Sequence, residues 1–174
     1  KYYRVNGGST QNRGVIPDIE LPSAIDTKRT GESSRPGALP WDQIRSARFE
    51  EFGSVQPDLQ SLREAQALRA ADNPDYAFLM KNVDAANEIR SQNSVSLNIE
   101  TRRTEQARRR DDRLVRENER RQANGESLLE NNEELESSEM PDVLLEQAVE
   151  IVTDYAAMPP KAPTTVVKSS ALLN

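Results

Sequence analysis

The sequence predicts an α+β chain that is mostly α, with an N-terminal β-hairpin followed by a helical domain of about four helices. Two patterns indicate this. Apolar side chains alternate near the amino end, as they do in a strand, and later recur at three- and four-residue spacing, as they do on an amphipathic helix. Because Leu, Ile, Val and Phe make up only 36 of 174 residues and the net charge is −6, we expect a modest core.

The hairpin is predicted over residues 1–22. Residues 1–5 alternate between two faces and are rich in aromatic and β-branched side chains, and a turn-forming cluster follows at residues 6–9. Residues 15–21 alternate again. Pro17 has no N–H to donate to a ladder, so we expect this second strand at the edge of a sheet.

Residues 23–40 show no periodicity and contain Gly, Pro, Ser and charged residues, so we predict a linker there. Apolar residues resume at Trp41, the only tryptophan of the chain. We expect the Trp41 side chain to dock its segment on the domain that follows. Gly14, which permits a sharp bend, and Pro17 are predicted with Trp41 to be structural anchors.

The helical domain is predicted over residues 41–157. Its expected helices lie near residues 57–71, 74–90, 100–124 and 141–157. Asn73 before Pro74 is a helix-start signal, and Gly125 is a helix-stop signal. The alternating segment 93–98 is predicted to be either a short strand or an extended connector. Residues 158–174 are predicted to be a disordered tail.

Opposite charges follow one another along the predicted domain. Residues 102–121 contain nine arginines and five acidic residues, and residues 126–150 contain nine acidic residues and no basic one. Acidic and arginine side chains stand four residues apart on the third helix, as helix-stabilising pairs do, at Glu105 and Arg109, Arg113 and Glu117, and Glu117 and Arg121. Compensation within the chain is the simplest interpretation, and a protein-docking surface is the alternative.

We assign candidate docking roles to seven of these arginines. They are Arg102, Arg103, Arg108, Arg109, Arg110, Arg113 and Arg116. A nucleic-acid interface is a third possibility, which the interleaved acidic residues, the absence of a nearby stacking platform and the isoelectric point near 4.9 all disfavour. We therefore expect no nucleic-acid partner.

The residue types restrict the chemistry. The chain has no Cys and no His, which removes disulfides, thiol nucleophiles, imidazole bases and nearly all zinc or iron sites. A serine nucleophile would then need a lysine base, and Lys1 with Ser9 is a weak candidate for such a dyad. We expect no catalytic residue, no metal, no cofactor and no membrane span, since no run reaches the roughly 18 apolar residues of a spanning helix.

Several short motifs resemble a known family of peptidases. The residues that carry the resemblance near the amino end are Tyr3, Arg4, Asn6, Gly7, Ser9, Gln11, Gly14, Val15, Pro17, Asp18 and Ile19. Further along they are Gly31, Glu32, Ala38, Leu39, Pro40, Trp41, Asp42, Val95, Ser96, Leu97 and Asn98. Together they resemble the C-terminal part of the tail-specific, or C-terminal processing, serine peptidases of the large periplasmic type.

The resemblance implies a parent enzyme with a Ser/Lys dyad and a PDZ module that captures apolar C-terminal ends of substrates. It implies that residues 1–22 are the terminal strands of the peptidase core, that residues 41–157 are a helical C-terminal domain, and that the location is periplasmic. Since the chain starts at Lys1 rather than Met, we expect a piece of a longer protein. The resemblance implies that the catalytic residues lie upstream of this piece. The expected partners are that core and PDZ module, protein substrates and an envelope adaptor protein. A stand-alone helical adaptor without peptidase activity is the alternative.

Overall fold

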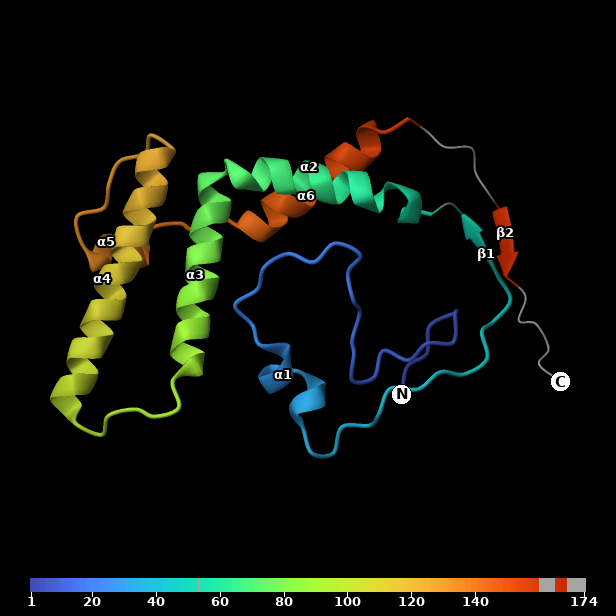
Figure 1. Cartoon of the computed structure of the whole chain (residues 1–174), viewed down its shortest axis with the longest axis horizontal. Helices are drawn as coiled ribbons and strands as arrows, with labels where there is room; N and C mark the ends of the chain where they lie inside the picture. Colours follow the sequence, from blue (N-terminus) through green and yellow to red (C-terminus); the bar gives the residue numbers. More distant parts are fainter. Residues whose placement is uncertain (53, 160–164, 169–174) are drawn as a thin grey trace. The chain divides into compact units, whose positions relative to one another are not determined.

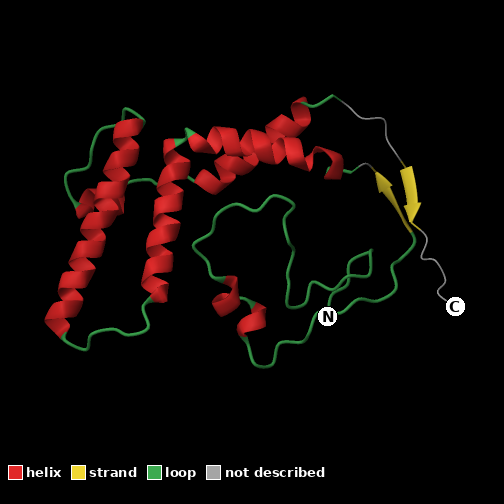
Figure 2. Ribbon diagram, viewed as in Figure 1, coloured by secondary structure: helices red, strands yellow, loops and turns green. Residues whose placement is uncertain are grey.

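The computed structural model describes residues 1–52, 54–159 and 165–168. Within these residues the chain is mostly helical with little strand, which confirms the predicted helical character (Figure 2). The four longer helices are α2 (Leu59–Ala71), α3 (Pro74–Ser91), α4 (Ile99–Ala123) and α6 (Val143–Ala157) (Figure 1). The shorter helical elements are α1 (Thr27–Thr30), α5 (Asn132–Ser137) and two 3-10 turns, Glu32–Ser34 and Gln56–Asp58. The sequence did not predict α1 or α5.

The starts of α3 and α4 follow from asparagine caps. The Asn73 side chain accepts a hydrogen bond from the backbone N–H of Tyr76 at 2.8 Å, and Pro74 occupies the start of α3. The Asn98 side chain accepts from the backbone N–H groups of the first turn of α4. Gly125, with a φ of 70°, follows the end of α4 and supplies the left-handed conformation common there. These signals are local, so the sequence predicts both helices closely.

The chain divides into two compact units. The first contains residues 1–20 and 25–63 and the described residues from 155 onward, and the second contains residues 21–24 and 64–154. In the second unit α3 and α4 run antiparallel, side by side, and α5 packs on α4 (Figure 1). Its buried apolar side chains are Phe78, Val83, Leu135 and Val143. Beside these four, the buried polar side chains of this unit are Glu117, Arg120 and Gln147.

The predicted N-terminal hairpin is wrong. The structure has no strand pairing of residues 1–5 with residues 15–21; instead an isolated antiparallel bridge joins Tyr3 to Ser9. Positive φ angles at Gly7 and Gly14 turn the backbone twice within this segment. Pro17 also lacks an N–H group and so cannot donate to a ladder with the first run.

The strands of the structure lie elsewhere. β1 (Phe49–Phe52) pairs antiparallel with β2 (Thr165–Lys168). β2 falls within residues 158–174, for which we predicted disorder; residues 160–164 and 169–174 lie outside the described residues. The segment 93–98 has no strand and is the extended connector of the two alternatives. The domain limits 22/23, 40/41 and 157/158 stay predictions.

Candidate functional site

The arginines of α4 fall into two groups. Those near the two ends of the helix form ion pairs with carboxylates close by in the sequence. These pairs join Arg102 to Glu105, Arg103 to Glu100, and both Arg120 and Arg121 to Glu117. Of the three four-residue pairs that the sequence predicts, only Glu117 with Arg121 is an ion pair among the described residues. The acidic residues of α4 therefore neutralise mainly its ends.

The second group comprises the five arginines in the middle of α4. Among the described residues, Arg108, Arg109, Arg110, Arg113 and Arg116 form no ion pair. Two of them bind neutral amide oxygens of α3 instead. Arg109 donates to Oε1 of Gln92 at 3.2 Å, and Arg116 donates to Oδ1 of Asn82 at 3.0 Å. Their positive charges thus remain uncompensated by any contact in the described part of the chain.

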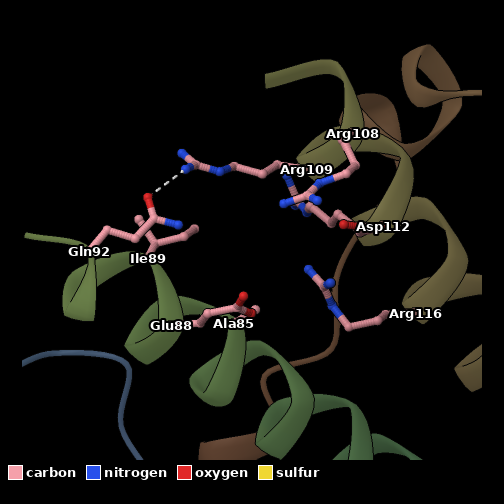
Figure 3. Close-up of a pocket in the computed structure, with 9 residues that line it drawn as sticks. Ala85, Glu88, Ile89, Gln92, Arg108, Arg109, Asp112 and Arg116 are labelled. Atoms are coloured by element: carbon pink, nitrogen blue, oxygen red, sulfur yellow. Dashed lines mark hydrogen bonds between the residues drawn. The ribbon is translucent and has the colours of Figure 1, made fainter. Parts of the chain in front are cut away.

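Four of these five arginines line a cleft between α3 and α4, which we call the arginine cleft. Its volume is about 150 Å³, and its lining residues are Ala85, Glu88, Ile89, Gln92, Arg108, Arg109, Asp112, Arg113 and Arg116. Figure 3 shows Arg109 reaching across to Gln92, with Arg108 and Arg116 on the α4 side. Four guanidinium groups against two carboxylates leave the lining with a formal charge of +2. An anionic group is therefore the ligand that the cleft suits electrostatically.

The seven arginines assigned from the sequence are thus separated by the structure. Arg108, Arg109, Arg113 and Arg116 come together in the arginine cleft, whereas Arg102, Arg103 and Arg110 do not line it. Arg102 and Arg103 form ion pairs with Glu105 and Glu100 near the start of α4, and Arg110 is exposed. Sequence spacing missed this division because acidic residues stand within three or four positions of nearly every arginine on the helix.

A buried ionic cluster lies at the C-terminal end of α4, and the sequence did not predict it as a unit. Arg120 donates to both carboxylate oxygens of Glu117 at 2.8 and 3.0 Å, to Asp75 at 2.8 Å and to Glu126 at 3.0 and 3.1 Å. Arg121 also donates to Glu117 at 2.9 Å. The Glu117 side chain is fully buried, and that of Arg120 is 5% exposed. The cluster ties α4 to α3 through Asp75.

Opposing effects act on the ionisation of this cluster. Burial raises the pKa of Glu117, but hydrogen bonds from Arg120 and Arg121 outweigh it, so the pKa lies below its usual value. The hydrogen bond with Glu117 is the largest effect that raises the pKa of Arg120. Glu117 stands three residues from Arg120 and four residues from Arg121, spacings at which side chains pair on a helix. The other partners of Arg120 are Asp75 of α3 and Glu126 after α4, and no local sequence pattern predicts these contacts.

The predicted structural anchors lie in the first unit. Trp41 Nε1 donates to the carbonyl oxygen of Ser9 at 2.8 Å, and the Arg13 guanidinium lies 4.2 Å from the centre of the Trp41 ring. Trp41 therefore docks on the N-terminal segment, which corrects the expectation that it docks on the domain beyond. Gly14 has a φ of 64°, as its turn requires, and Pro17 is exposed.

The Lys1 and Ser9 dyad has the wrong geometry for catalysis. Lys1 Nζ lies 2.9 Å from Asp42 Oδ2, and the hydrogen bond with Asp42 raises the pKa of the Lys1 ammonium. The Ser9 hydroxyl accepts a hydrogen bond from the backbone N–H of Gln11 at 2.9 Å, and the residue is buried. A general base must lose its proton readily, so an ammonium held by a carboxylate is unsuited to activate this serine.

The described residues also bear on metal sites and membrane spans. They contain no group of three or more metal-ligating side chains placed to hold an ion. None of the helices formed by these residues has the length and apolar character needed to cross a bilayer. The expected absence of a cofactor stays a prediction.

Comparison with known proteins decides the family. A family model described as the C-terminal domain of tail-specific protease matches residues 25–157. The chain belongs to this family. A curated tail-specific protease of Haemophilus influenzae is 36% identical over 159 residues, which cover 89% of this chain and 23% of that protein. The matched segment thus spans less than a quarter of that relative's length, and the resemblance that the sequence motifs predicted is confirmed.

Proposed function

We propose that this chain is the non-catalytic C-terminal domain of a periplasmic tail-specific serine endopeptidase, which degrades or trims proteins from apolar C-termini. The observation that carries the proposal is the family match over residues 25–157. The H. influenzae relative, a tail-specific protease more than four times as long as the shared segment, supports a parent protease with room for a separate catalytic region.

The domain positions the peptidase core, shapes the access of substrates or docks a partner, and it does not act on the reacting bond. The arginine cleft supports a docking role, because its guanidinium groups are arranged around a concavity and lack carboxylate partners among the described residues. The partners we propose are the peptidase core and PDZ module of the same polypeptide and its protein substrates. An envelope adaptor protein is a further candidate partner for the cleft.

The side chains that could supply a nucleophile in this chain support the non-catalytic assignment. Lys1, the candidate base for Ser9, is held as an ammonium by Asp42. Ser34 donates its hydroxyl to the carbonyl oxygen of Gly31 at 2.7 Å in an exposed turn. Neither serine has the activated, base-paired geometry of a nucleophile.

The test replaces Ser9, Ser33 and Ser34 together by alanine in the longer protease and measures kcat/KM for a protein substrate with an apolar C-terminus. We expect kcat/KM within about threefold of the parent value, because none of the three serines would touch the reacting bond. A thermal melt controls for loss of folding, since Ser9 is buried. Abolished cleavage in a folded variant would place the nucleophile in this chain and overturn the proposal.

A further inference from the structure

We propose that the arginine cleft binds the acidic segment of a second copy of this chain, so that the domain pairs two protease molecules. The acidic segment is residues 130–146, and its acidic side chains are Glu130, Glu133, Glu134, Glu136, Glu139, Asp142 and Glu146. This inference rests on the proposed docking role and names its occupant. Support for the proposal comes from the ion pairs that the cleft arginines and the acidic segment do not form within the described part of one chain.

The cationic side of the contact is available. In the described part of the chain, Arg108 and Arg113 are exposed and have no hydrogen bond or ion pair, and Arg109 and Arg116 bind only neutral amide oxygens. A guanidinium binds a carboxylate through two parallel hydrogen bonds, which are stronger than a bond to an amide. Ile89, 44% exposed in the cleft, offers apolar contact to the alkyl part of a Glu side chain.

The anionic side is available as well. No Lys or Arg occurs between residues 126 and 150, and none of the seven acidic side chains of the acidic segment forms an ion pair within the described residues. The flanking acids differ, since Glu126 pairs with Arg120 and Glu150 lies 3.8 Å from Arg69. Ion pairs within the chain therefore neutralise Glu126 and Glu150, which flank the acidic segment, and leave the negative charges of the acidic segment itself unpaired among the described residues.

Geometry keeps the acidic segment away from its own cleft. Asn132 of α5 donates to Asp111 at 3.1 Å, and Asn118 exchanges two hydrogen bonds with the backbone of Leu129. Asp111 and Asn118 are seven residues apart and so share one face of α4. Relative to Asp111, Arg109 and Arg113 point roughly 160° away around the helix, at 100° per residue, toward α3, whereas Arg108 stands about 60° away. The acidic segment would have to detach from α4 to reach Arg109 and Arg113 of its own chain.

A twofold axis between two copies can bring the acidic segment of one copy to the arginine cleft of the other. In a twofold dimer residue i of one copy meets residue j of the other and the reverse, so each arginine cleft receives an acidic segment and the contact forms twice. Two apolar side chains of α6, Leu145 within the acidic segment and Val149 just beyond it, are 59% and 55% exposed and add surface that such a contact can cover. Opposite charges on one chain thus become self-complementary between two chains.

The test is the oligomeric state of the 174-residue chain and of the longer protease, measured by sedimentation equilibrium. We expect a dimer at about 50 mM salt whose dissociation constant rises at least about tenfold at about 500 mM salt, because screening weakens contacts between opposite charges. The variant R108Q/R113Q should raise it by a similar factor. The matched control R103Q/R110Q removes two exposed charges from the same helix outside the cleft and should change it less than about twofold.

A charge swap distinguishes the occupant. R108E/R113E alone and E136K/E139K alone should each be monomeric, and all four changes on one chain should restore the dimer. Circular dichroism confirms folding, and the altered side chains are exposed. A monomeric parent chain, or a dimer that the cleft variants leave intact, would overturn the proposal, as would a monomer that binds an acidic peptide, since the occupant would then be another protein. None of these outcomes affects the serine test of the proposed function.

Discussion

Replacing Arg120 by leucine tests the buried ionic cluster. The side chain of Arg120 makes five hydrogen bonds to three carboxylates, and it is 5% exposed. Its loss leaves the fully buried Glu117 carboxylate with Arg121 as its remaining cationic partner. A buried charge that loses its partner is costly because water cannot replace the lost interactions. We therefore expect R120L to destabilise the folded chain strongly.

The size of the effect follows from burial. Removing one member of a buried ion pair costs about 3–5 kcal/mol. Arg121 still reaches Glu117 at 2.9 Å, and Asp75 and Glu126 are 21% and 39% exposed, so they regain water. These features place the expected loss near the lower limit, at about 3 kcal/mol in the free energy of unfolding. For a chain of this size the melting temperature should fall by about 6–12 °C.

Urea unfolding followed by circular dichroism at the helical band measures the loss. R103L is the matched control, because Arg103 is on the same helix and pairs with Glu100 at three-residue spacing while 70% exposed. An exposed pair of this kind contributes about 0–1 kcal/mol. The double variant E117Q/R120L should cost less than the sum of the two single changes. Equal losses for R120L and R103L would refute the reasoning that burial makes the cluster important.

Three further predictions concern acid stability, backbone strain and capping. The pKa of Glu117 is lower in the folded chain than its ordinary value of 4.5, so its contribution to the free energy of unfolding is complete above pH 4.5 and is lost as pH falls through the folded pKa. In acid titrations, the free energy of unfolding of E117Q should therefore decline less steeply over this pH range than that of the parent chain. Gly7→Ala should expose residues 1–48 to proteolysis, since φ is 83° and a Cβ would lie 2.1 Å from the carbonyl oxygen of Ile44, whereas Gly37→Ala, in open space, should not. Asn98→Ala should lower the unfolding free energy by about 1 kcal/mol in urea titrations through loss of the α4 cap, and an unchanged midpoint would contradict that role.

The sequence predicted helices better than strands for a physical reason. The signals for α3 and α4 lie within a turn of each helix end, as with the caps at Asn73 and Asn98. Strand pairing depends on a partner that can lie anywhere in the chain, and the strand at 49–52 pairs with residues 165–168 rather than with a neighbour. The expected hairpin at residues 1–22 failed because alternation alone does not identify a partner.

The candidate site was predicted in part. Sequence composition singled out the arginines of α4, and four of the seven assigned residues line the arginine cleft. Spacing alone did not distinguish Arg113, which has no carboxylate partner in the described structure, from Arg103, which pairs with Glu100. Arg120 was outside the assigned set, and its partner Asp75 comes from α3, which only the packed structure brings near.

The measurement that tests the account most directly compares two proteins in one cleavage assay. The 174-residue chain and the longer protease that contains it are each given a folded substrate protein with an apolar C-terminal tail. We expect cleavage by the longer protease only, because the proposed function assigns the reacting groups to a region outside this domain. Cleavage by the 174-residue chain alone would contradict the assignment, and inactivity of both would favour a helical adaptor without peptidase activity.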